Sequence, residues 1–297
     1  MNLLQKFAGV TVTADTRITE ADRHFCQTHQ AAYDNAKSCL QELAFFWEDI
    51  LSKQTELMHG ITESSCLYLT SGDNLNLSKT DIQKQLFAIH GLFVGHLVSF
   101  FNKTYHLSLS IMDMEEKLIP QKPTDKWMDD YEDQVREYTK AMQDLSLRYT
   151  DILDQIFLYT DGRELSEQAL HELKEKCHGA AWNVSNGKAR FTLKKCTLLL
   201  GGYACGYRDL YGYWELTQDT KNILWGISHF ETGSFSTVPY SISRITGTHN
   251  PRSDFHEFND CDKVLSLKMY KNHRVDIKFS TEDNARQFIN DYLGPIC

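Results

Sequence analysis

Apolar residues recur at helical spacing through residues 125–159, the most regular pattern in the chain. Successive members are three or four positions apart, which places them on one face of a helix. They are Trp127, Tyr131, Val135, Tyr138, Met142, Leu145, Tyr149, Ile152 and Ile156. The spacing predicts one long helix from Asp125 to Tyr159, and an apolar face of that length needs an equally long partner.

A second stretch with the same spacing follows Thr19 and ends near Gly60. The positions on this face are Phe25, His29, Ala32, Ala36, Cys39, Leu43, Phe46 and Ile50, all apolar except His29. Thr19, with Asp22 three residues later, is typical of a capping box at a helix N-terminus. These features predict that the two long helices pack against each other as an antiparallel or crossed pair. An apolar face that extends past its partner would also allow a homodimer.

Between the two long stretches, the pattern predicts a third helix over residues 80–101. Gly91 and Gly95 within it would let another part of the backbone approach closely. Alternating apolar and polar residues from Tyr105 to Met112 predict a strand. After the long helix, a shorter one is predicted to end at Gly179.

Beyond residue 180 the pattern changes to short segments typical of strands. Residues 182–214 predict two or three strands, Thr217 caps a helix, and a loop covers residues 233–251. Val264–Met269 and Val275–Phe279 predict a hairpin, and Ser280 is expected to cap the last helix. The predicted fold class is therefore α+β, with a long-helix N-terminal domain over residues 1–179. A small mixed α/β domain over residues 180–297 ends in strand–turn–strand–helix.

Composition agrees with a folded protein. The 297 residues are 41% hydrophobic and 12% aromatic, enough for a substantial core. No apolar run reaches the roughly 18–20 residues that span a bilayer, and the first ten residues lack the features of a signal peptide. We therefore expect a soluble, cytoplasmic protein without membrane association. Eight cysteines form no CxxC pair, which favours reduced and mostly buried thiols over disulfides or zinc: Cys26, Cys39, Cys66, Cys177, Cys196, Cys205, Cys261 and Cys297.

Negative charge is concentrated in one region. Residues 113–176 contain 17 acidic and 9 basic side chains, a balance of −8 within the total of −9. The acidic residues considered for partner binding are Asp129, Asp130, Glu132, Asp133 and Glu137. Such a face repels nucleic acid and attracts basic surfaces, including the phosphate-binding grooves of proteins that handle DNA or RNA. A solvated helix face would have the same composition.

Candidate catalytic chemistry is sparse. Asp254, His256, Glu257, Asp260 and Asp262 supply carboxylates and an imidazole suited to a divalent metal or to acid–base catalysis. Neighbours on an irregular loop seldom converge on one ion, so this cluster is a minor alternative. No glycine-rich cofactor motif or nucleophile motif is present. The sequence thus predicts no cofactor and no catalytic residues, and it favours a non-enzyme.

Basic and aromatic residues gather just after residue 187. Tyr203, Tyr207, Arg208, Tyr211, Tyr213 and Trp214 would suit stacking with unpaired bases, although a sheet core gives the same pattern. Including the lysines and arginine before them, the candidate nucleic-acid-binding residues are Lys188, Arg190, Lys194, Lys195, Tyr207 and Arg208. Four basic residues before the aromatic run are too few for useful affinity at physiological salt, so direct nucleic-acid binding is not expected.

The C-terminal hairpin carries a family resemblance. Residues 268–279 read KMYKNHRVDIKF and precede a capped helix with Phe288 and Asn290. This segment resembles the end of a domain of unknown function from phage and mobile-element proteins, which some relatives join to a DNA methyltransferase. The early helix with Trp47, the helix at 80–101 and residues 213–230 resemble that domain more loosely. His273 stands where the family has glycine, so the turn must differ or place a non-glycine residue at positive φ.

Two hypotheses follow. The first is a non-catalytic phage or mobile-element protein that binds a protein partner, such as a basic nuclease, through its acidic helical surface. It would act as anti-restriction and anti-CRISPR inhibitors do. The alternative is a nucleic-acid-associated accessory domain, or a metal-dependent enzyme that uses residues 254–262. The resemblance implies no catalytic residues for either.

Overall fold

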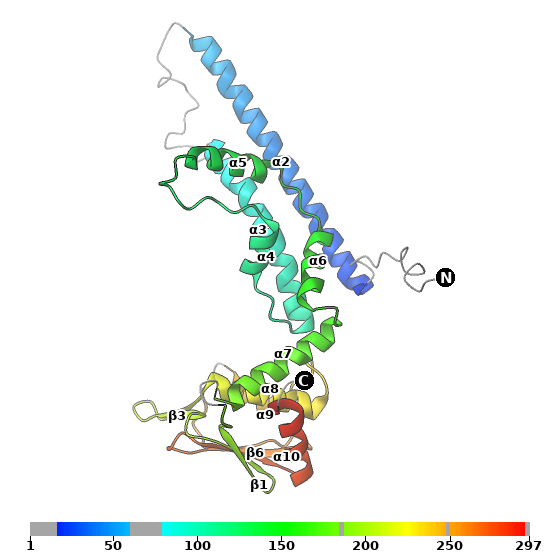
Figure 1. The fold of residues 1–297 in the computed structure, drawn as a ribbon, viewed down its shortest axis with the longest axis vertical. Helices are drawn as coiled ribbons and strands as arrows, with labels where there is room; N and C mark the ends of the chain where they lie inside the picture. Colours follow the sequence, from blue (N-terminus) through cyan, green and yellow to red (C-terminus); the bar gives the residue numbers. More distant parts are fainter. Residues whose placement is uncertain (1–16, 60–78, 184–186, 248–249, 295–297) are drawn as a thin grey trace, which may run out of the picture. The chain divides into compact units, whose positions relative to one another are not determined.

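The computed structural model of the chain describes residues 17–59, 79–183, 187–247 and 250–294 (Figure 1). It divides into two compact units, residues 1–164 and 165–297. The first is helical and the second contains an antiparallel sheet, so the predicted α+β class is confirmed. The boundary lies at Glu164/Leu165 instead of the predicted 179/180, because helix α7 (Leu165–Ala181) packs against helix α8 (Gln218–Thr232) of the second unit.

Helix α2 (Glu20–Met58) begins with the predicted capping box. The Thr19 hydroxyl accepts from the Asp22 amide at 3.2 Å, and the Asp22 carboxylate accepts from the Thr19 amide at 3.0 Å. The Tyr105 hydroxyl also donates to this carboxylate at 2.6 Å, so the cap joins the start of α2 to the end of helix α3 (Lys79–Tyr105). Local sequence alone was enough to find this helix start.

Replacing Thr19 by alanine should lower the free energy of unfolding of the N-terminal unit by about 1 kcal/mol, the usual cost of losing a cap side chain. Urea unfolding followed by circular dichroism would measure the loss. Thr55→Ala, on an exposed turn of the same helix, is the control and should change stability by less than about 0.5 kcal/mol. A Thr19→Ala protein as stable as the control would contradict the role of the cap.

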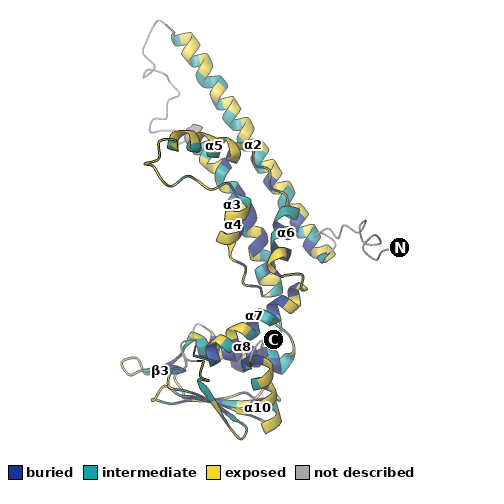
Figure 2. Ribbon diagram, viewed as in Figure 1, coloured by how far each residue is buried: buried dark blue, intermediate teal, exposed yellow. Residues whose placement is uncertain are grey.

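The partner of α2 is α3, which corrects the predicted pairing with residues 125–159. Aromatic rings join the two helices: Phe25 stacks on Phe100 with centroids 3.8 Å apart, and Tyr33 on Phe93 at 4.5 Å. Buried apolar side chains cover more than one side of α3, so it forms the centre of this unit (Figure 2). A helix that is apolar on several sides buries more surface against α2 than a narrow apolar face can.

The predicted long helix is two helices, α5 (Tyr131–Asp144) and α6 (Tyr149–Tyr159). Side chains of α2 bind the backbone of the four residues between them. Lys37 donates to the Leu145 carbonyl at 2.7 Å and Gln30 to the Leu147 carbonyl at 3.0 Å, and Gln30 also accepts from the Tyr149 amide at 2.7 Å. These bonds replace those that a continuous helix would make, so the interruption leaves these groups satisfied.

Helix α4 (Ile111–Leu118) replaces the predicted strand at 105–112. Ser110 caps it, and the Asn102 side chain exchanges two hydrogen bonds of 2.9 Å with the backbone of Leu109. A Cβ atom on Gly91 would lie 3.0 Å from the Glu115 carboxylate, and one on Gly95 would lie 3.7 Å from Ile111. The two glycines therefore allow α4 to lie close to α3.

Among the described residues, one helix segment, Asp81–Tyr105 of α3, is long and apolar enough by length and composition to cross a membrane. Its buried side chains, such as Val94 and Leu97, are enclosed by neighbouring helices of the same unit. A core helix of a soluble protein passes the same test, so this segment is weak evidence for a membrane span.

The C-terminal unit contains a five-stranded antiparallel sheet in the order β1-β2-β7-β6-β5. The strands are β1 (Phe191–Lys194), β2 (Thr197–Leu200), β5 (Phe255–Glu257), β6 (Val264–Met269) and β7 (Val275–Phe279). Leu198 pairs with Ile277, and Ile277 with Leu267, so one face of the sheet is apolar and buried. Helices α7, α8 and α10 (Glu282–Phe288), with the π-helical segment η3 (Ile289–Leu293) after α10, supply most of the other core side chains.

The predicted C-terminal hairpin is confirmed as β6 and β7. His273 in its turn has φ 66°, so a non-glycine residue occupies the left-handed region there. Thr281 caps α10, one residue after the predicted Ser280. Helix α9 (Tyr240–Thr246) and strand β5 lie in the stretch around residues 233–257, where sequence patterns gave no regular structure.

A separate two-stranded hairpin, β3 (Cys205–Arg208) and β4 (Tyr213–Leu216), precedes α8. With β1 and β2 it gives four strands in a stretch where two or three were predicted. The chain runs directly from β4 into α8 through Thr217, which caps that helix. This connection places the hairpin beside the first turn of α8, where the groove described below lies.

Candidate functional site

The acidic surface consists of Asp129, Asp130, Glu132, Asp133 and Glu137, and all five residues are exposed. They lie at the start of α5 and in the loop before it. Arg136 forms an ion pair with Asp133 one turn away, and Gln134 donates to Asp130 at 2.9 Å. Both contacts are local to the helix surface. The carboxylates are therefore presented to solvent and not used in the core.

Trp127 lies directly before the acidic surface and is 95% exposed. The next residue, Met128, is 50% exposed. The prediction that Trp127 belongs to a packed apolar face is wrong, because α5 begins at Tyr131 and the preceding residues do not share its helical phase. A tryptophan this exposed leaves a large apolar area in water, and tryptophan is among the residues most enriched at the centres of interfaces.

The structure separates the candidate nucleic-acid-binding residues. Lys194 and Lys195 lie at the β1–β2 turn, whereas the Arg190 carbonyl accepts from Gly201 at the other end of the same strand pair. Lys188 is exposed before β1. The Arg190 guanidinium lies 3.3 Å from the Tyr203 ring centroid and binds the Asp219 carboxylate at 2.9 Å. The six residues therefore form no single basic patch.

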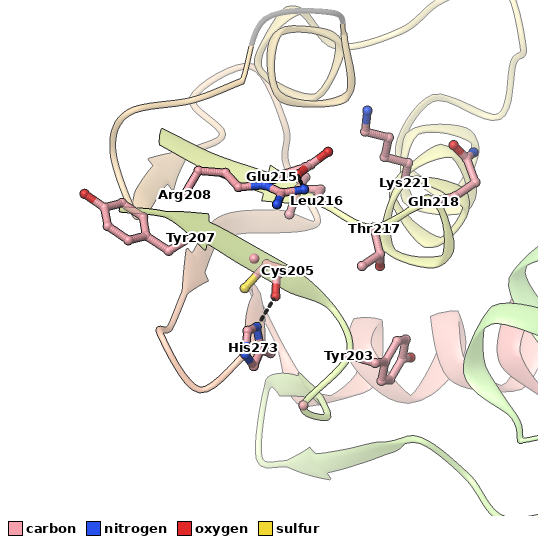
Figure 3. A pocket seen from close by; sticks show the side chains of 12 residues that line it. Tyr203, Cys205, Tyr207, Arg208, Glu215, Leu216, Thr217, Gln218, Lys221 and His273 are labelled. Carbon is pink, nitrogen blue, oxygen red and sulfur yellow. Dashed lines mark hydrogen bonds and ion pairs between the residues drawn. The ribbon is translucent and has the colours of Figure 1, made fainter. Parts of the chain in front are cut away.

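Tyr207 and Arg208 line a groove of about 850 Å³ between the β3–β4 hairpin and the first turn of α8 (Figure 3). Its other lining residues are Gly202, Tyr203, Cys205, Gly206, Glu215, Leu216, Thr217, Gln218, Lys221 and His273. Arg208 forms an ion pair with Glu215 across the hairpin at 2.8 Å. Sequence reasoning missed Lys221 and His273, since nothing in their local patterns shows that the fold brings them to this hairpin.

The aromatic rings at the groove are already partly covered. Lys271 lies 4.7 Å from the Tyr207 centroid, and Trp214 packs against the same ring at 4.8 Å. The Tyr203 hydroxyl donates to the Ala180 carbonyl at 3.0 Å. These contacts leave less ring surface for stacking than the sequence suggested. They instead fix the positions of the side chains around the groove.

Cys205 and His273 do not form a nucleophilic pair, although both line the groove. The His273 Nδ1 donates to the carbonyl oxygen of Cys205 at 2.9 Å, and the thiol donates to the Arg274 carbonyl at 3.4 Å. Burial raises the pKa of the Cys205 thiol. A thiol that stays protonated and points at backbone carbonyls is a poor nucleophile.

The five residues considered for metal binding do not converge. The buried His256 imidazole bonds to the Ser253 carbonyl at 2.9 Å, and burial lowers its pKa. Asp260 accepts from the Ser241 amide at 3.1 Å and from its hydroxyl, so it caps α9. Asp254, Glu257 and Asp262 are exposed. Among the described residues, no group of three or more His, Cys, Asp or Glu side chains could hold a metal ion.

The six described cysteines are all free thiols. Cys26, Cys177 and Cys205 are buried, Cys196 and Cys261 are half-buried, and Cys39 is exposed. Desolvation raises the pKa of Cys177 to about 12. Desolvation, followed by the nearby Glu231 carboxylate, raises that of Cys261 to about 12. Cys66 and Cys297 lie outside the described residues.

Comparison with protein-family models, curated proteins and solved structures finds no match to this chain. The resemblance of the C-terminal hairpin to the phage domain of unknown function therefore stays a prediction.

Proposed function

We propose that this chain is a non-catalytic interaction protein that binds a protein partner through the acidic surface and Trp127. The observation that carries the proposal is the 95% exposure of Trp127 next to a run of exposed carboxylates. A surface of this kind suits a partner that has an apolar pocket within a basic region. The carboxylates would guide the approach of the partner, and the indole would supply most of the affinity.

Basic grooves that bind phosphates belong to proteins that handle DNA or RNA, so the proposed partner is a nuclease or another such protein. Occupying that groove would exclude nucleic acid, and the chain would then act as an inhibitor. Such a partner works inside the cell, which makes the cytoplasm the proposed location. Because the C-terminal hairpin resembles a domain of phage and mobile-element proteins, we include such an origin in the proposal. The proposed partners are then defence proteins that handle nucleic acid.

The metal-dependent alternative has less support, because the residues proposed for it point to different partners. The accessory-domain alternative also has less support, because the basic residues proposed for it lie apart and form no single patch.

The proposal is tested with purified nucleases and nucleic-acid-binding proteins that have basic grooves, by biolayer interferometry at 50 and 300 mM salt. Trp127→Ala should weaken binding to a panel member about 30-fold at both salt concentrations, the loss expected for a hot-spot residue. Asp129→Asn, Asp130→Asn, Glu132→Gln and Asp133→Asn together should weaken binding mainly at low salt. Duplex DNA should compete with the chain for the partner.

Matched controls come from the C-terminal unit. Asp254→Asn, Glu257→Gln, Asp283→Asn and Asp291→Asn together remove the same charge, and Trp225→Ala removes a partly exposed indole. Neither control should change binding more than about twofold. If no panel member binds, or if the controls weaken binding as much as the test variants, the proposal is wrong.

A further inference from the structure

The groove between the β3–β4 hairpin and α8 has the size of a small-molecule site. Its volume of about 850 Å³ falls within the roughly 300–1,000 Å³ common for ligand pockets. In Figure 3, β3 and β4 form one wall, the first turn of α8 forms the other, and the segment with Tyr203 and Cys205 lies beneath with His273. The groove has room for a ligand much larger than a simple ion.

The charged side chains of the groove leave one positive charge without a counter-charge. Arg208 and Glu215 offset each other through their ion pair. Lys221 is half-buried, and its ammonium group has no hydrogen bond or ion pair with any residue in the described part of the chain. A lysine that lines a groove and has no anionic partner there is available to bind an anion, and a charge-assisted hydrogen bond from it would stabilise the bound ligand.

Backbone donors lie near the same position. Thr217 caps α8 by accepting from the Thr220 amide, and the Lys221 amide donates to the Thr217 carbonyl. The amides of Gln218 and Asp219, in the first turn, have no acceptor among the described residues. The Asp219 carboxylate is also at this helix end, but Arg190 already pairs with it at 2.9 Å. The amides therefore add partial positive charge to that of Lys221.

We propose that this groove binds a phosphate-bearing ligand, with the phosphate between Lys221, Arg208 and the first turn of α8. Phosphate offers several acceptor oxygens, and the guanidinium of Arg208 keeps N–H groups that Glu215 does not use. The organic part of the ligand would lie along Tyr207 and the backbone of residues 202–206. The proposal concerns the C-terminal unit alone and does not depend on the acidic surface.

Isothermal titration of the full chain with three ligands tests this site: inorganic phosphate, a nucleoside monophosphate, and a short single-stranded oligonucleotide. We expect saturable binding of the nucleoside monophosphate, tighter than that of phosphate because its organic part fills more of the groove. Lys221→Met should weaken binding about tenfold or more, the loss expected for a charge-assisted hydrogen bond. Arg208→Gln should weaken it to a similar extent.

Lys194→Met is the matched control, because Lys194 is an exposed lysine at the far end of β1 from Arg190. It should leave binding within about twofold, and all variants should retain the circular dichroism spectrum of the parent. Tighter, salt-sensitive binding of the oligonucleotide, lost with Lys221→Met, would assign the phosphate to a nucleic acid instead of a free nucleotide. Absence of saturable binding of all three ligands, or equal weakening by Lys194→Met, would overturn the proposal. Trp127→Ala should not change these results, so this test is distinct from that of the acidic surface.

Discussion

Replacing Gly226 by alanine is expected to lower the free energy of unfolding of the C-terminal unit by about 2 kcal/mol. A Cβ atom at this position of α8 would lie 2.5 Å from the Cys177 Sγ, 3.4 Å from Tyr292 and 3.6 Å from Phe288. Overpacking of a filled core costs roughly 1–3 kcal/mol, whereas alanine in place of glycine in a helix gains about 1 kcal/mol. The steric cost is larger here because Cys177 is fully buried and donates to the Asn222 carbonyl at 3.3 Å.

Two further variants separate steric overlap from other effects of this substitution. Cys177→Ala combined with Gly226→Ala removes the overlapping sulfur and should recover most of the lost stability. Gly179→Ala introduces the same side chain in α7, where no atom lies within 4 Å of the new Cβ, and should stabilise the unit by up to about 1 kcal/mol. Urea unfolding of the four proteins measures these differences. Equal stability of Gly226→Ala and the parent would contradict the close approach of α7 and α8 at Cys177.

Replacing His90 by alanine is expected to lower the free energy of unfolding of the N-terminal unit by about 3 kcal/mol. His90 is fully buried on α3. Its Nε2 donates to the Met142 carbonyl at 3.1 Å, and its Nδ1 accepts from the Tyr33 hydroxyl at 2.8 Å. The Leu147 amide in turn donates to that hydroxyl at 3.4 Å. Loss of the ring therefore leaves a cavity and unpaired polar groups at the end of α5.

The same histidine makes stability depend on pH. Burial, followed by the charge of Lys37, lowers the pKa of His90 below 6.5. The folded protein therefore holds the imidazole neutral, while the unfolded chain takes up a proton below about pH 6.5. The stabilisation that this residue provides is present above pH 6.5 and declines as the pH falls towards the folded-state pKa.

Urea unfolding at pH 7.5, 6.5 and 5.5, with hydrogen exchange to assign the loss to the N-terminal unit, measures both effects. His90→Gln removes the titrating group, so its stability should fall less steeply over this range than that of the parent. Burial also lowers the pKa of His29, which remains in both proteins and cancels in the comparison. Parallel pH profiles for the two proteins would contradict the assignment to His90.

Local signals in the sequence were sufficient for much of the secondary structure. Thr19 with Asp22, Thr217, and the alternation in β6 and β7 all specify their elements through neighbouring residues. The interruption between α5 and α6 could not be predicted in this way, because Leu145 and Tyr149 keep the helical spacing and no glycine or proline lies between them. The cause is the hydrogen bonding of Gln30 and Lys37, which are more than a hundred residues away.

In the candidate sites too, features set by neighbouring residues could be predicted and features set by distant residues could not. The acidic surface was predicted from charge alone, since carboxylates of that density seldom pack inside a protein. The exposure of Trp127 was not predicted, because the helical spacing assigned it to the core. In the structure Trp127 lies in a turn before α5, where its amide donates to the Asp125 carboxylate at 3.1 Å. The groove requires the segment from Gly202 to Lys221, which holds the β3–β4 hairpin and the start of α8, to meet His273 in the turn between β6 and β7. A contact between residues this far apart in the sequence leaves no sign in the local pattern of either segment.

The interruption at residues 145–148 has a consequence for how the chain tolerates insertions and deletions. In a continuous helix, one added residue would turn everything beyond it by about 100° and move its apolar face out of contact. Here the carboxylates lie on α5 and in the loop before it, and the irregular residues 145–148 connect α5 to α6. An added or deleted residue within α5 would therefore leave α6 and the core around α3 in register.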